Sequence, residues 1–73
     1  MPLIQVKVIE EVFTAAQKKE IIEKLTDAMV SIEGEKMRAV TTVLIEDVRS
    51  GDWGLGGKVM TTEAVRGLAT GKG

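Results

Sequence analysis

The stretch TAAQKKEIIEKLTDAMVSIE, residues 14–33, decides the fold because it predicts one long amphipathic helix. Its apolar residues recur at helical spacing: Ile21, Ile22, Leu25, Ala28, Met29 and Ile32. The lysines and acidic residues between them supply a polar face. Thr14, with Gln17 three residues later, matches a capping box, and Gly34 stands where helices commonly end. We therefore expect a helix from about Thr14 to Glu33.

A β-strand is expected on the amino-terminal side of this helix. In LIQVKVIE, residues 3–10, the apolar residues Ile4, Val6 and Val8 alternate with polar ones. Alternation with a period of two, carried by β-branched residues, is typical of a strand with one buried face. A short connector, EEVF, would then join this strand to the helix.

A second strand is expected on the other side of the helix. AVTTVLIEDV, residues 39–48, is rich in β-branched residues, and Val43, Leu44 and Ile45 run together. Apolar residues on both faces indicate a strand more buried than the first. A strand, a helix and a strand joined by short connectors imply a right-handed crossover and two parallel strands.

The remaining third of the chain is less regular. RSGDWGLGGKV, residues 49–59, has four glycines within seven residues, which indicates turns with positive φ rather than a regular element. MTTEAVRGLATGKG, residues 60–73, has weak helix or hairpin tendency, and we expect residues 68–73 to be frayed. The prediction is a single α/β domain over residues 1–73, a small β-α-β subunit ending in a glycine-rich turn or hairpin.

Composition indicates that this subunit does not act alone. The chain has 73 residues, no cysteine and no histidine, so disulfides and most zinc sites are excluded. Yet 44% of the residues are hydrophobic, a high share for so short a chain. A two-stranded sheet is marginally stable and has open edges. We therefore expect copies to complete one another's sheets in a homo-oligomer.

Charge and hydropathy exclude other classes of partner. Ten lysines and arginines stand against eleven acidic residues, which argues against binding to a nucleic-acid backbone. Two aromatic residues offer few platforms for stacking bases. No apolar run approaches the roughly 20 residues of a membrane span, and no signal peptide is recognisable. A cytoplasmic protein without nucleic-acid or membrane partners is expected.

The amino terminus offers the one distinctive chemical group. Pro2 is small enough that removal of Met1 is expected, which would expose a secondary amine. An α-amino group has a reference pKa near ~8, and burial in an apolar site would lower that pKa further. A neutral amine at pH 7 accepts and returns a proton, which is general acid–base catalysis without histidine. The structural alternative is that Pro2 only precedes the first strand and has no chemical role.

The order of four segments resembles the 4-oxalocrotonate tautomerase family. These are MPLIQVKVIE, TAAQKKEIIEKLTDAM, TTVLIEDV and GDWGLGG, and they cover residues 2 to about 57. Members of that family are small β-α-β subunits, typically hexamers built from dimers, with active sites at subunit boundaries. The resemblance implies an isomerase that moves protons on a small 2-keto or unsaturated acid. It also implies no metal or organic cofactor, because the amine supplies the acid–base group.

The same resemblance implies roles for particular residues. Pro2 would be the general base, and Trp53 falls where the family places an aromatic residue that walls the site. Two substrate-binding arginines of the family have no counterpart here: their positions read Phe13, or Val12 if the one-residue insertion lies elsewhere, and Thr42. Neither Phe nor Thr supplies charge-assisted bidentate bonds, so a more apolar or monocarboxylate substrate is expected.

The sequence leaves open which residue binds the substrate carboxylate and which reaction is catalysed. Arg38 and Arg49 flank the second strand, where either would hold a carboxylate from a neighbouring subunit or serve as an ordinary surface residue. A related enzyme that adds water, such as a dehalogenase, hydratase or decarboxylase, would need a carboxylate from Glu10, Glu11 or Asp52. A scaffold that keeps the fold without the chemistry is the non-enzymatic alternative.

Overall fold

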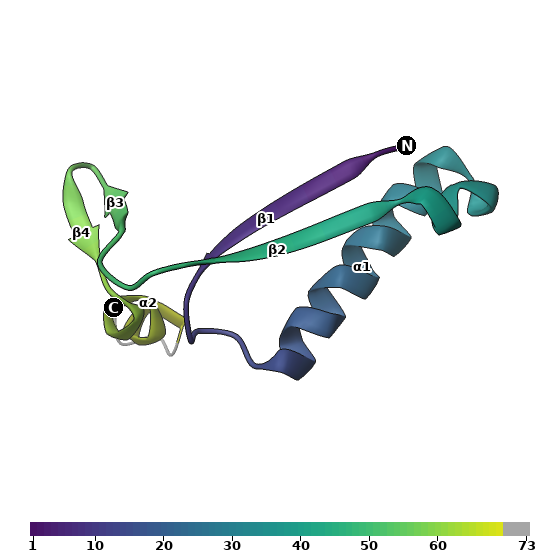
Figure 1. Ribbon diagram of the computed structural model, residues 1–73. Helices are drawn as coiled ribbons and strands as arrows, with labels where there is room; N and C mark the ends of the chain where they lie inside the picture. Colours follow the sequence, from purple (N-terminus) through teal and green to yellow (C-terminus); the bar gives the residue numbers. More distant parts are fainter. Residues whose placement is uncertain (70–73) are drawn as a thin grey trace.

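The computed structural model describes residues 1–69, which form two small sheets and three helical segments. The elements are β1 (Leu3–Ile9), α1 (Ala15–Glu33), the 3₁₀ helix η1 (Glu35–Val40), β2 (Thr42–Val48), β3 (Trp53–Leu55), β4 (Lys58–Met60) and α2 (Thr62–Ala69). β1 and β2 pair in parallel, from Leu3 beside Thr42 to Ile9 beside Val48. The expected β-α-β unit with parallel strands is therefore confirmed (Figure 1).

Helix α1 begins and ends at the expected residues. The Thr14 hydroxyl accepts the Gln17 backbone N–H at 3.1 Å, and the Gln17 side-chain oxygen accepts the Thr14 N–H at 2.9 Å. This reciprocal capping box satisfies two backbone donors that the first turn leaves unpaired. At the other end Gly34 has φ of 104° and donates its N–H to the Val30 carbonyl at 2.8 Å. A residue with a Cβ atom is strained at that φ, which explains the glycine.

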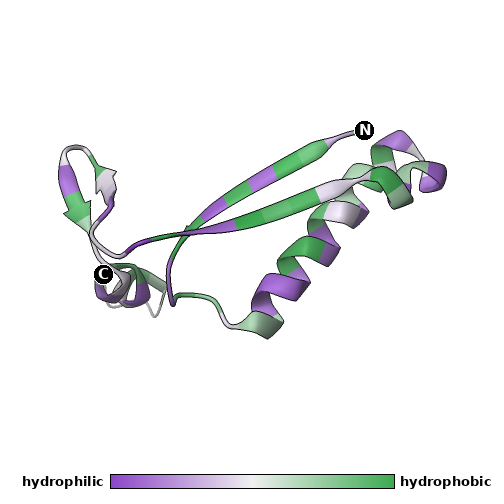
Figure 2. Cartoon of the chain, viewed as in Figure 1, coloured by the Kyte–Doolittle hydropathy of each residue, from purple (hydrophilic) through white to green (hydrophobic). Residues whose placement is uncertain are grey.

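The main sheet is covered on one face only. Ile4, Val6 and Val8 are half-buried on β1, whereas the residues between them are exposed. α1 crosses beneath both strands in Figure 1, and apolar and polar bands alternate along β1 and α1 in Figure 2. Among the described residues the buried apolar side chains are Ile9 and Val30. The other face of the sheet is open in a single copy.

Two expectations about β2 are wrong. It begins at Thr42 rather than Ala39, because residues 39 and 40 complete the 3₁₀ helix η1 that follows α1. It is also not more buried than β1: none of its residues, all described, is buried, and Leu44 is 44% exposed. The apolar residues on its second face have no layer to pack against within one chain.

The glycine-rich segment forms a regular element after all. β3 and β4 pair antiparallel, with Leu55 opposite Lys58, so Gly56 and Gly57 make a two-residue turn. Their φ values are 57° and 83°. Positive φ at both central positions is the geometry that tight hairpins favour, because its twist matches that of the strands. The expected glycine-rich turn or hairpin is therefore confirmed as a hairpin. The bounds of its strands could not be predicted, since three-residue strands are too short to show a pattern.

The last described element is a helix rather than a hairpin. α2 begins at Thr62, and the Thr61 hydroxyl caps it by accepting the Ala64 N–H at 3.2 Å. Residues 68 and 69, expected to be frayed, lie within α2, and residues 70–73 lie outside the described part of the chain. Neither α1 nor α2 is both long and apolar enough to span a membrane, and the same holds for all helices within residues 1–69.

Candidate active site

One end of the molecule holds an apolar cavity of about 460 Å³ that is open to solvent. Three segments far apart in the sequence form its walls. The end of β1 and the connector after it contribute Ile9 and Phe13, the β3–β4 hairpin contributes Trp53, and α2 contributes Val65 and Leu68. In Figure 1 the hairpin and α2 lie together at the end of the sheet that is remote from the amino terminus.

A chain of hydrogen bonds holds α2 against the end of β1. The Thr62 hydroxyl donates to the Glu10 carbonyl at 2.7 Å, and the Thr62 N–H donates to the Ser50 hydroxyl at 2.9 Å. The Ser50 N–H in turn donates to the Glu10 carboxylate at 2.7 Å. Thr62 is 5% exposed, so these bonds are largely shielded from water. They fix the helix that carries Val65 and Leu68 to the strand end beneath the cavity.

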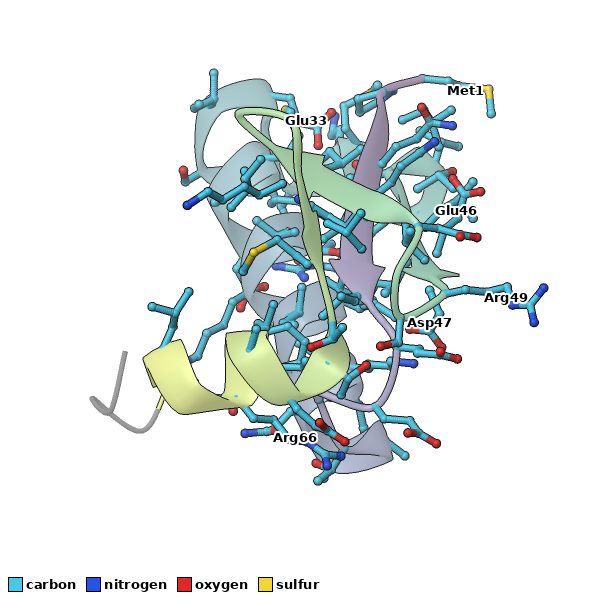
Figure 3. All side chains as sticks on the ribbon, turned by 90° about the vertical axis from the view of Figure 1, so that its left-hand side faces the viewer. Met1, Glu33, Glu46, Asp47, Arg49 and Arg66 are labelled. Carbon is cyan, nitrogen blue, oxygen red and sulfur yellow. The ribbon has the colours of Figure 1, made fainter. Side chains whose placement is uncertain are left out.

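The connector after β1 is fixed by a second contact. Glu11 has φ of 62°, in the left-handed region, where a side chain strains the backbone. Its carbonyl accepts two hydrogen bonds from the Arg66 guanidinium, one of them from Nε at 3.1 Å. Arg66 lies on α2, as Figure 3 shows. The same helix therefore holds the connector after β1 that places Phe13 at the cavity.

Pro2 lies at the opposite end of the sheet. It precedes the seven residues of β1. A strand rises about 3.3 Å per residue, which makes β1 roughly 20 Å long. Pro2 is half-buried, and its carbonyl accepts the Thr42 N–H at 3.1 Å. Thr42, itself exposed, therefore lies beside Pro2 and not beside Phe13 or Trp53. Within one chain the predicted base and the predicted aromatic wall do not meet.

The two arginines that flank β2 have different surroundings. Arg38 pairs with Glu35 at 2.7 Å and with Asp27 at 2.8 Å. Hydrogen bonds from Arg38 hold the pKa of Glu35 below its ordinary value, and the carboxylates of Glu35 and Asp27 raise the pKa of Arg38. Arg49 is exposed, forms no ion pair within residues 1–69, and extends away from the body in Figure 3. Neither arginine lines the cavity.

The sequence matches the model of one protein family, described as "Tautomerase enzyme", over residues 2–63. The chain belongs to the tautomerase family. That membership covers most of the chain and makes it an isomerase of the tautomerase type, as the resemblance to the 4-oxalocrotonate tautomerases implied.

Relatives and a solved structure support this assignment. "Probable tautomerase K2" of Dickeya dadantii is 36% identical over 61 residues, 84% of this chain and 90% of the relative. The "2-hydroxymuconate tautomerase" of Pseudomonas putida is 42% identical over 57 residues, 78% of this chain and 87% of the relative. A structure among the 4-oxalocrotonate tautomerase isozymes of Methylibium petroleiphilum superposes with a TM-score of 0.72 at 34% identity, covering 88% of this chain and 97% of that one.

For a tautomerase, this chain distributes its candidate residues over two groups. Pro2 and Thr42 lie at one end of the sheet, and Phe13 and Trp53 share the cavity at the other end. Sequence reasoning did not find Lys7 and the α2 residues that also line the cavity. Spacing of Val65 and Leu68 by three residues is a helical signal, but a window of eight residues is too short to separate it from chance.

The described residues also bear on metal binding. Within residues 1–69 no three acidic side chains, and no other group of metal-binding side chains, gather closely enough to hold an ion.

Proposed function

We propose that this tautomerase transfers a proton on a small 2-oxo or unsaturated acid that carries one carboxylate and an apolar group. Pro2, freed by removal of Met1, is the general base and acid. The observation that carries this proposal is the position of Pro2, half-buried at the head of β1 and the first residue of the family match. The Met1 side chain beside it is 91% exposed, so the Met1–Pro2 bond lies at the surface, where it is open to processing.

The chemistry follows from a neutral secondary amine. The neutral Pro2 nitrogen removes the proton of an enol hydroxyl, which leaves an enolate and a Pro2 ammonium. The ammonium then delivers that proton to the substrate carbon, so that the ketone forms and the neutral amine is regenerated. Partial burial favours the uncharged amine, since desolvation disfavours an ammonium ion. A single group that both takes and gives a proton needs no histidine and no metal.

The full site requires more than one copy. Pro2 and Trp53 lie at opposite ends of a sheet roughly 20 Å long. A substrate of a few carbon atoms therefore touches both only if the aromatic wall comes from a neighbouring subunit. We accordingly propose that the chain self-associates through dimers, in a hexamer or another dimer-based assembly. Thr42 then borders the proton-transfer end, and Phe13 with Trp53 receives the apolar group.

The test is ketonisation of the enol of phenylpyruvate, followed by ultraviolet absorbance. Pro2→Ala keeps a primary amine, so we expect partial activity. The expected reduction in kcat/KM is about tenfold, less than the roughly 10²–10⁴-fold that a positioned acid–base group contributes. A matched control inserts one alanine before Pro2, which keeps every side chain but buries the proline nitrogen in a peptide bond. That protein is expected to lose the Pro2-dependent rate entirely.

Intact-mass spectrometry accompanies these rates. It measures whether Met1 is absent from the wild-type protein and whether the inserted alanine is the first residue of the control. Equal rates in the wild-type protein and both variants would contradict the proposal. A retained Met1 together with no activity would instead favour the scaffold alternative.

A further inference from the structure

The connector between β1 and α1 has a backbone conformation that its own residues do not favour. Glu11 has φ of 62°, and within residues 1–69 it is the one residue other than glycine with a positive φ. In this region the Cβ atom crowds the next carbonyl oxygen, so a residue such as glutamate rarely adopts it. A contact from outside the connector is therefore needed to hold Glu11 in place.

Arg66 supplies that contact from α2 (Figure 3). Its guanidinium donates two hydrogen bonds to the Glu11 carbonyl, the one from Nε at 3.1 Å. Within residues 1–69 Arg66 forms no ion pair with a carboxylate. The two donors lie in one rigid plane, so together they fix the direction of the carbonyl that they share. The contact thereby fixes the peptide unit that follows the left-handed φ.

α2 is itself held firmly against the end of β1. Thr62 donates to the Glu10 carbonyl at 2.7 Å and lies four residues before Arg66. Residues four apart lie on the same side of a helix, so one side of α2 binds the strand end and the connector at two points. Val65 and Leu68, on the same helix, line the cavity. One short helix thus bonds to the connector and also forms a wall of the cavity.

The residues that directly follow Glu11 reach the cavity. Val12 and Phe13 both line it. A rotation about φ of Glu11 changes the direction of the chain after it, and so moves both side chains together. Phe13 is 37% exposed, which means that packing within the described part of the chain covers it only in part. The position of this wall therefore depends on the conformation of Glu11.

We propose that Arg66 is a positioning residue that favours substrates with an aromatic group. By holding the Glu11 carbonyl it keeps Val12 and Phe13 where they receive the apolar group of the substrate. This role rests on the proposed function, whereas the effect of Arg66 on the connector does not. Arg66 lies beyond residue 63, where the family match ends, so the family model does not cover this contact.

Kinetic constants separate positioning from chemistry. Arg66→Met keeps an apolar stem and removes the donors. The left-handed φ should then be populated about one-tenth as often, and KM for the enol of phenylpyruvate should rise about tenfold. The value of kcat should stay within about twofold, because the wall binds the ring and touches no reacting atom. The enol of pyruvate, released from phosphoenolpyruvate by a phosphatase, has no ring, and its KM should not change.

A double-mutant cycle with Glu11→Gly tests how Arg66 acts. Glycine adopts a left-handed φ without strain, so a connector with this change no longer depends on the guanidinium. In a protein that carries Glu11→Gly, the further change Arg66→Met should raise KM for the phenylpyruvate enol by less than about threefold. A tenfold rise in that background, or an equal rise for the enol of pyruvate, would overturn the proposal.

Lys19→Met is the control for charge. It removes one positive charge from the exposed side of α1, away from the connector, and should leave both KM values unchanged. An effect equal to that of Arg66→Met would show that net charge, and not the contact with Glu11, sets KM, and would contradict the positioning role.

A second variant leaves α2 intact, in case Arg66→Met unfolds the helix. Glu11→Val makes the left-handed φ less accessible, because a β-branched residue is a rare outlier there. It should raise KM for the phenylpyruvate enol and leave KM for the enol of pyruvate unchanged. Wild-type constants for both substrates in Glu11→Val would overturn the proposal.

Backbone NMR chemical shifts of Glu11 test the contact without any turnover. In the wild-type protein and in Lys19→Met they should indicate a left-handed φ, and in Arg66→Met they should move toward extended values. Shifts that stay left-handed in Arg66→Met would contradict the positioning role alone. Shifts that move as expected, in a protein whose wild type turns over neither enol, would contradict the proposed function alone.

Discussion

Thr62 joins three segments that are distant in sequence. Its hydroxyl and its backbone N–H bond to Glu10 and Ser50 respectively, and both bonds are shielded because the residue is 5% exposed. Removal of the hydroxyl would leave the Glu10 carbonyl without its donor in a place that water reaches poorly. An unsatisfied buried group costs more than the bond it loses.

Replacement of Thr62 by valine, which has nearly the same shape, should therefore destabilise the protein. We expect a loss of about 1–2 kcal/mol in the free energy of unfolding, from the missing bond and the unpaired carbonyl. Urea unfolding at fixed protein concentration measures it. Thr26→Val is the matched control, because the Thr26 hydroxyl donates only to the Ile22 carbonyl in its own helix. Similar losses of free energy of unfolding in both variants would show that the hydrogen bond to Glu10 stabilises the protein no more than a bond within one helix.

α1 is the element that local sequence signals specify most completely. A capping box begins it, a glycine with positive φ ends it, and apolar residues recur along one face. These signals act within one or two turns, so they hold in any tertiary context. β2 shows the opposite behaviour. Its apolar residues face both ways, and what covers its second face depends on neighbours that a single chain does not supply.

The cap of α1 is testable by substitution at Thr14. Thr14→Ala removes the acceptor for the Gln17 N–H and should lower the free energy of unfolding by about 1 kcal/mol, the typical value for a lost cap. Thr14→Ser keeps the hydroxyl and should stay within a few tenths of a kcal/mol of the wild-type value. Thermal unfolding followed by circular dichroism compares the three proteins. An alanine variant as stable as the serine variant would contradict a role for the cap.

At the scale of the whole molecule a single copy encloses little core. Ile9 and Val30 are the buried apolar side chains of the described part, while Leu3 is 56% and Leu44 is 44% exposed on the open face of the sheet. The molecule is also elongated, with extents of 42 × 22 × 18 Å. Exposed apolar residues that share one sheet face indicate a surface that a second copy covers.

Self-association is therefore expected to contribute to stability. Sedimentation equilibrium should detect assemblies larger than the 7.9 kDa chain, and the unfolding midpoint should rise with protein concentration. Leu44→Lys places a charge on the open face and should shift the equilibrium toward the single chain. Ala16→Lys adds the same charge on the exposed side of α1 and should leave assembly unchanged. A monomer at all concentrations in the wild-type protein would refute both this expectation and a site shared between copies.

The sequence by itself determined β1, α1, the parallel β-α-β unit and the candidate base at Pro2, because alternation, helical spacing and capping residues act over short distances. Only the tertiary structure decided which candidates meet. Phe13 and Trp53 share a cavity, Pro2 lies roughly 20 Å from it, and Arg38 is bound in local ion pairs. It also revealed Lys7 and α2 as parts of that cavity. Apart from the ion pairs of Arg38, these relations join residues forty or more positions apart. Such contacts depend on packing and on long-range hydrogen bonds, such as that from Thr62 to Glu10, which no short window of sequence contains.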